Sequence, residues 1–220
     1  MLALLCIFSL RLPAQFEDNI TCCNKPHHKK FIHGNTSTYT IHHAIHNYDV
    51  RFYFLDIELS KTSAYIKGIV RIDAEVTSTL LDTFVVELIP SLTIDSVHVN
   101  SIARSVSRSG DEVYVTGLSF SNSNTISVQI WYHGTPNTGG GFFSGISTGT
   151  SPFWGAQATW TLSEPFNAKQ WWPVKQVLED KADSAWVFIT TDSTNKAGSN
   201  GMLTGISNIS NNKVRYEWKT

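Results

Sequence analysis

The sequence predicts an all-β fold dominated by antiparallel pairing, arranged as a β-sandwich or a saddle-shaped domain. Three observations lead to this prediction. Apolar and polar residues alternate along several runs of strand length, turn-forming residues separate these runs, and no helical pattern long enough for a crossover lies between them. Closely spaced strands without crossover helices favour an antiparallel architecture over a doubly wound one.

Length and composition are consistent with one globular domain. The chain has 220 residues, of which 41% are hydrophobic and 12% aromatic, and this is enough to build a sizeable core. Only 16% of the residues are charged, and the formal net charge is −1. A chain without a basic field is a poor ligand for nucleic acid, so we expect no nucleic-acid partner.

The first residues resemble a secretory signal. An apolar run over residues 2–10 is too short to span a bilayer but suits the core of a signal peptide. We expect residues 1–14 to be the signal peptide, with cleavage after Ala14. The expected location is therefore secreted, periplasmic or on the cell surface, without stable membrane insertion after cleavage.

Residues 15–47 are polar and rich in histidine, and they read as an extended leader before the fold. His42 and His46 stand four residues apart, as two metal ligands on one helical turn would. A zinc peptidase motif, however, reads His-Glu-x-x-His, and His43 stands here in place of the glutamate that activates the metal-bound water. We therefore assign no metal site to this segment.

The domain is expected to cover residues 48–220. Residues 48–59 form a β-rich run, and after a turn near 61–63 a second run over 65–76 alternates well. One face of this second run is apolar and consists of Ile66, Val70, Ile72, Ala74 and Val76. Further expected strands are 82–89, 93–100, 112–117, 125–133, 186–191 and 213–219, with a turn at 199–203.

The segment 159–183, TWTLSEPFNAKQWWPVKQVLEDKAD, holds three tryptophans, two prolines and a central acid. Pro165 supplies no N–H and disfavours helical geometry at the residue before it, so Glu164 is predicted on a turn. A carboxylate held by such a rigid anchor is well placed to bind a cationic ligand, because little side-chain freedom remains to be lost. The other interpretation is a buried structural turn with an acid at its edge.

The same segment resembles the N-terminal domain of the aminopeptidase N family of zinc metallopeptidases, the gluzincins, of the bacterial secreted type. In that family a Gln or Glu stands nine residues before a Pro, a basic residue lies between them, and a D-K-A-like triplet follows. Glu164, Lys169, Pro173 and the triplet 180–182 match in this order, and SNGML at 199–203 adds to the likeness. Lys169 replaces the usual Arg, and Val174 replaces a frequent Cys.

The resemblance implies a substrate-entrance domain in which Glu164 helps to bind the free α-amino group of a peptide. Pro165, Lys169, Pro173 and Asp180 would support the turn. The resemblance places no catalytic residue and no metal ligand in this chain; zinc is expected in a downstream catalytic domain of the same polypeptide, which carries His-Glu-x-x-His. The chain alone is then expected to be inactive, and to stop before the last strands of the domain.

The residues themselves also allow a second function. A non-enzymatic β-sandwich module for binding or adhesion could use Trp154, Trp160, Trp171 and Trp172 as stacking faces. The reading frame downstream discriminates between the two hypotheses, because only the peptidase needs a His-Glu-x-x-His motif there.

Overall fold

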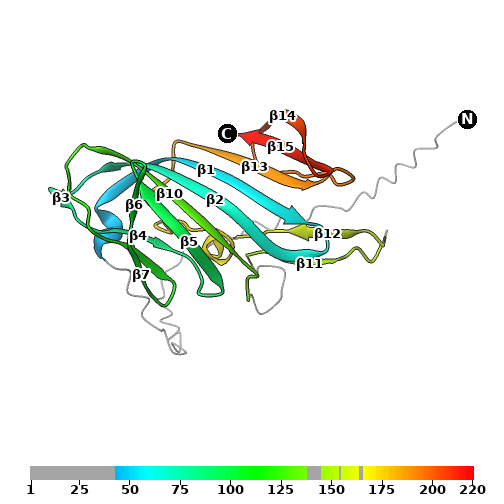
Figure 1. The fold of residues 1–220 in the computed structure, drawn as a ribbon, viewed down its shortest axis with the longest axis horizontal. Coiled ribbons are helices and arrows are strands. Elements are labelled where there is room, and N and C mark those ends of the chain that lie inside the picture. Colours follow the sequence, from blue (N-terminus) through cyan, green and yellow to red (C-terminus); the bar gives the residue numbers. More distant parts are fainter. Residues whose placement is uncertain (1–42, 138–144, 154, 164–165) are drawn as a thin grey trace, which may run out of the picture. The chain divides into compact units, whose positions relative to one another are not determined.

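A computed structural model describes residues 43–137, 145–153, 155–163 and 166–220 (Figure 1). The predicted signal peptide and nearly all of the predicted leader lie outside these residues. The described regular structure is β-strand apart from two 3₁₀ helices, η1 (His43–His46) and η2 (Ala168–Gln170). The predicted all-β class is confirmed. None of the described helices has the length and apolar character needed to cross a membrane.

The largest sheet has eight strands, and all of its neighbouring strands are antiparallel except β1 and β13, which run parallel. Antiparallel pairing therefore dominates, as predicted. In spatial order the strands are β14 (Met202–Ile209), β15 (Lys213–Lys219), β13 (Ser184–Asp192), β1 (Tyr48–Ser60), β2 (Ser63–Val76), β10 (Thr125–Gly134), β5 (Leu92–Val99) and β6 (Ile102–Arg104).

Three smaller sheets accompany the large one. They are β4 (Phe84–Glu87) with β8 (Glu112–Val115) and β7 (Val106–Ser109), β3 (Leu80–Leu81) with β9 (Phe120–Ser121), and β11 (Ser147–Thr150) with β12 (Gln157–Trp160). Buried side chains of the β4–β8–β7 sheet share one apolar cluster with buried side chains of β1, β2 and β10. The core therefore lies between these two layers, and the opposite face of the large sheet carries the charged residues.

Strand β2 occupies the centre of the large sheet, between β1 and β10. Its burial alternates residue by residue, and the five side chains predicted to share an apolar face are all buried. Such alternation fixes the register, since a slip by one residue would turn every apolar side chain toward solvent. The predicted turn near 61–63 closes the β1–β2 hairpin at Lys61 and Thr62.

Several short strands, among them β6, β7, β11 and β12, were not predicted from the sequence. Two further segments also differ from the prediction. Ala44 and Ile45 in η1 are buried against Val85, so packed residues precede the boundary placed at Tyr48. The span 199–203, predicted as a turn, contains a bend at 200–201, and β14 begins at Met202. Most of β14 is exposed on both faces, and such a strand lacks the alternation of apolar and polar residues that marks a half-buried one.

The central position of β2 leads to a stability prediction. Ile72 is fully buried and faces Tyr53 on β1 and Val128 on β10. Ile72→Ala is expected to lower the free energy of unfolding by about 2–5 kcal/mol, because it leaves a cavity in a packed core. Ile102→Ala, at a site that is 57% exposed, should change it by less than about 1 kcal/mol. Urea unfolding of both variants checks this.

Candidate functional site

The residues predicted to form the site lie on one segment between β12 and β13. Glu164 and Pro165 fall outside the described residues, but both flanks are described. Trp171 Nε1 donates to Ser163 Oγ at 2.8 Å, and the Asn167 N–H donates to the Ser163 carbonyl at 3.2 Å. Ser163, just before the predicted turn, is therefore linked both to Asn167 after the turn and to the Trp171 indole.

Lys169 attaches the segment to the β4–β8–β7 sheet. Its Nζ lies 3.1 Å from Glu87 Oε1 and 3.1 Å from Asp111 Oδ2. The Lys169 side chain is 14% exposed and that of Glu87 only 1%. Burial raises the pKa of the Glu87 carboxyl above its ordinary value, and the nearby Lys169 ammonium opposes this shift. The lysine thus compensates a carboxylate that has lost its hydration.

Backbone hydrogen bonds also join the segment to the β4 strand and the residues after it. The Glu87 N–H donates to the Val174 carbonyl at 2.8 Å, and the Val174 N–H donates to the Glu87 carbonyl at 3.0 Å. The Ile89 N–H donates to the Lys169 carbonyl at 3.0 Å. Pro173, next to the Val174 bridge, is buried, and proline needs no donor partner there. Lys169 and Pro173 therefore lie where the segment joins the β4 edge.

Lys175 and Asp180 form a second buried attachment, toward β1. Their side chains are 3% and 8% exposed and make an ion pair. Lys175 Nζ also donates to the Tyr48 carbonyl, while Asp180 accepts from the Val50 N–H at 3.2 Å. Burial lowers the pKa of the Lys175 ammonium, and Asp180 opposes that shift. The Lys175 N–H donates to the Tyr53 hydroxyl at 3.2 Å.

The segment is also joined to the chain around Gly145. The Gly145 N–H donates to Gln170 Oε1 at 2.5 Å. A Cβ atom at position 145 would lie 2.3 Å from Gln170 Cβ, so no larger residue fits without displacing the backbone. Glycine at this position therefore permits the close approach.

The structure shows that two of the four tryptophans of the alternative hypothesis pack against the domain. Trp171 and Trp172 are partly buried and pack against the core, and Trp172 contacts Tyr53 edge to face at 4.9 Å. Trp160 is 41% exposed, and Trp154 lies outside the described residues. The two central indoles therefore serve packing.

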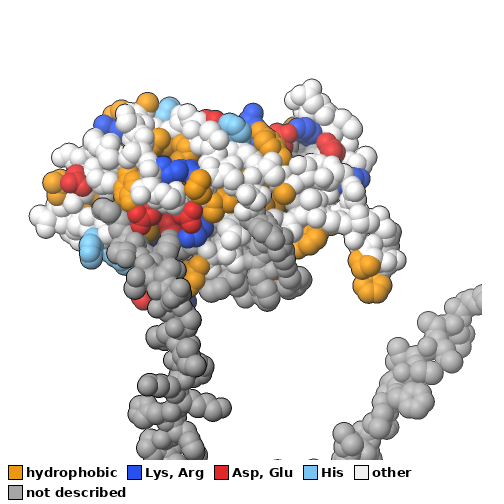
Figure 2. Space-filling view, turned by 90° about the horizontal axis from the view of Figure 1, so that it is seen from below, with side chains coloured by type: hydrophobic (Ala, Val, Ile, Leu, Met, Phe, Trp, Pro, Cys, Tyr) orange, Lys and Arg blue, Asp and Glu red, His pale blue; other side chains and the backbone are white. Residues whose placement is uncertain are grey.

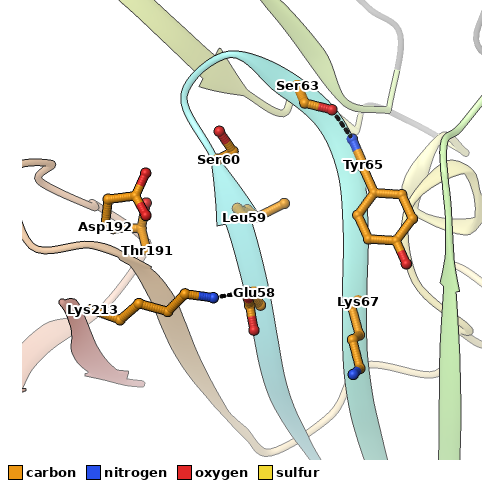
Figure 3. A pocket seen from close by; sticks show the side chains of 9 residues that line it. All are labelled: Glu58, Leu59, Ser60, Ser63, Tyr65, Lys67, Thr191, Asp192 and Lys213. Carbon is orange, nitrogen blue, oxygen red and sulfur yellow. Dashed lines mark hydrogen bonds and ion pairs between the residues drawn. The ribbon is translucent and has the colours of Figure 1, made fainter. Parts of the chain in front are cut away.

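A pocket of about 220 Å³ opens elsewhere, beside the β1–β2 turn. In Figure 3, Glu58 from β1 and Lys213 from β15 point toward each other at this pocket and form an ion pair, with Tyr65 and Lys67 on β2. None of the predicted site residues that the structure describes lines this pocket.

Figure 2 shows one face of the molecule, on which acidic and basic side chains lie side by side among hydrophobic ones.

Two residues of the arrangement were not singled out from the sequence. Glu87 lies in the apolar run FVVELI, and a charged residue inside such a run signals a buried partner. Lys175 follows Pro173 within WWPVK and gives no comparable signal. Among the described residues no group of three or more His, Cys, Asp or Glu side chains is placed to hold a metal ion. The described part of the chain therefore offers no donor set for zinc.

Comparison with solved structures shows which fold this is. The M1 zinc metallopeptidase from Deinococcus radiodurans matches with a TM-score of 0.67 at 20% identity, over 79% of this chain and 39% of that one. Yeast LTA4 hydrolase in complex with bestatin matches with a TM-score of 0.60 at 13% identity, over 83% and 29%. The fold is that of the N-terminal domain of M1 zinc metallopeptidases.

A third similar structure is a mutant of the Deinococcus radiodurans enzyme bound to a Tyr-Ser-Ala substrate, with a TM-score of 0.65 at 18% identity. The present chain spans about two-fifths of the length of the bacterial enzymes that it matches. Comparisons with protein-family models and with curated proteins find no match.

The buried ion pair leads to the second prediction. Lys169→Met keeps most of the side-chain volume but leaves Glu87 buried without its cation, and the expected loss is about 3–5 kcal/mol in the free energy of unfolding. Lys213→Met removes a partner from an ion pair in which Glu58 is 48% exposed, and should cost at most about 1 kcal/mol. Chemical denaturation near pH 7 measures both. Equal effects of the two substitutions would contradict a special role for Lys169.

Proposed function

We propose that this chain is the N-terminal, substrate-entrance domain of a secreted zinc-dependent aminopeptidase of bacterial type, and that Glu164 helps to bind the free α-amino group of peptide substrates. The observation that carries the proposal is the fold, shared with M1 zinc metallopeptidases, together with the match of Glu164, Lys169, Pro173 and Asp180 to the family pattern. Secretion is part of the proposal because residues 2–10 have the character of a signal-peptide core.

The attachments of the segment support this role for Glu164. Ser163 and Asn167 on its two sides are hydrogen-bonded to each other, and Lys169 follows closely with two carboxylate partners. A binding residue is more effective when its backbone is already fixed, since less conformational entropy is lost when the ligand arrives. The buried contacts would then fix the position of a carboxylate that contributes binding rather than chemistry.

The chemistry of such a residue is recognition of a cation. A carboxylate and an ammonium form a strong charge-assisted hydrogen bond. If the ammonium is held at a fixed distance from the reacting carbonyl, only the first residue of a peptide is placed for cleavage. The proposed partners are therefore the amino terminus of a peptide and a downstream catalytic domain. That domain would supply the zinc that activates water.

The third prediction tests Glu164 in a polypeptide that includes the catalytic domain. Glu164→Ala is expected to raise KM for peptides with a free amino terminus by about ten- to a hundredfold, the equivalent of one hydrogen bond to a charged group. Zinc content should not change. Steady-state kinetics on aminoacyl anilides and metal analysis provide the two readouts.

The matched control is Glu179→Ala, an exposed acid on the same segment. It should leave KM unchanged, because it removes a charge without touching the predicted turn. An unchanged KM in Glu164→Ala would refute the assignment of this residue. The absence of a His-Glu-x-x-His motif from the complete reading frame would refute the peptidase itself and favour a binding module.

A further inference from the structure

The outer strand β14 carries exposed apolar side chains on both of its faces. Met202, Leu203, Ile206 and Ile209 are 74%, 42%, 56% and 40% exposed. Within the described part of the chain, β14 pairs with β15 on one side only, and it ends the sheet (Figure 1). Its free edge therefore presents a row of backbone donors and acceptors beside apolar side chains.

Among the described residues, the layer that covers the core does not extend under β14. Ile206 lies opposite Tyr216 of β15, which is only 4% exposed, whereas Ile206 itself is 56% exposed. The burial of apolar surface thus stops between two paired residues of neighbouring strands. An apolar side chain left uncovered beside a buried one gains free energy from any further layer or strand that covers it.

The opposite edge of the same sheet is protected in a way that β14 is not. Strand β6 has only three residues, and Arg104 at its end donates to the Gly117 carbonyl. Short length and charge are two of the devices by which proteins prevent edge-to-edge pairing. The eight residues of β14, MLTGISNI, include no charged residue and no proline. A bulge at Thr204 is the one irregularity in its pairing with β15.

We propose that β14 pairs antiparallel with β14 of a second copy of this chain, which extends the sheet across a two-fold axis. If the bulged Thr204 and Gly205 are counted as one position, the axis passes at Ile206. Ile206 then lies opposite its own copy, Met202 opposite Ile209, and Leu203 opposite Asn208. Every opposed pair shares a face, as antiparallel neighbours must.

The second copy is the occupant that the charges favour. An edge without charged residues meets no like charge when it faces itself, and each apolar end of the strand meets the apolar end of its partner. One pair of strands buries less area than a standard interface, so the expected dimer is weak, with a Kd of about 10–100 µM. This association does not depend on the proposed peptidase role.

Sedimentation equilibrium of the 220-residue chain tests the proposal. The weight-average mass should rise from monomer toward dimer between about 1 and 200 µM. Ile206→Lys and Ile206→Asp each place two like charges opposite each other at the axis, and each should weaken the dimer at least about tenfold. A mixture of the two variants should regain association, because Lys then faces Asp. Far-ultraviolet dichroism verifies that both variants keep the fold.

Ile102→Lys is the matched control, since it adds the same charge at an exposed apolar site on the opposite edge. It should leave the association unchanged. A wild-type chain that stays monomeric to 200 µM would overturn the proposal. So would association that survives in both Ile206 variants, a mixture that fails to regain it, or an equal loss in Ile102→Lys.

Discussion

The interaction on which this structure most depends is the buried ion pair between Lys169 and Glu87. It joins a segment without regular strands to the edge of the β4–β8–β7 sheet, and the two backbone bonds between Glu87 and Val174 lie beside it. A desolvated carboxylate is costly unless a cation compensates it, so the lysine and the sheet edge depend on each other. The segment is thereby held as part of the domain rather than as a surface loop.

A second buried lysine, Lys175, attaches the segment to the large sheet. Lys175 pairs with Asp180 and reaches the Tyr48 carbonyl, so that the chain between Lys169 and Asp180 spans both layers. These contacts fix the stretch from Lys169 to Asp180 against the domain. The proposed function needs a fixed carboxylate at Glu164, because a carboxylate that recognises one ammonium position must itself have one position. Packing, charge compensation and proposed recognition thus rest on the same few contacts.

The sequence was most informative where one face of a strand is buried. The alternation in β2 predicted its core face residue by residue, and the family pattern pointed to Lys169 and Asp180 before their partners were visible. It was least informative where neighbours decide the outcome. Strand β14 has no buried face and therefore no periodic signal, and the pairing of Lys175 with Asp180 depends on a fold that brings β1 alongside them.

Native-state hydrogen exchange of the Val174 and Glu87 amides tests the central claim most directly. These two N–H groups form the bridge between the segment and β4. If the buried ion pair holds the segment in place, both amides should exchange as slowly as the amides of the central strand β2. Exchange would then require opening of the whole domain. In Lys169→Met they should exchange faster than the β2 amides. If the Val174 amide of the wild-type chain exchanges at the rate of an exposed loop, the ion pair does not hold the segment in place.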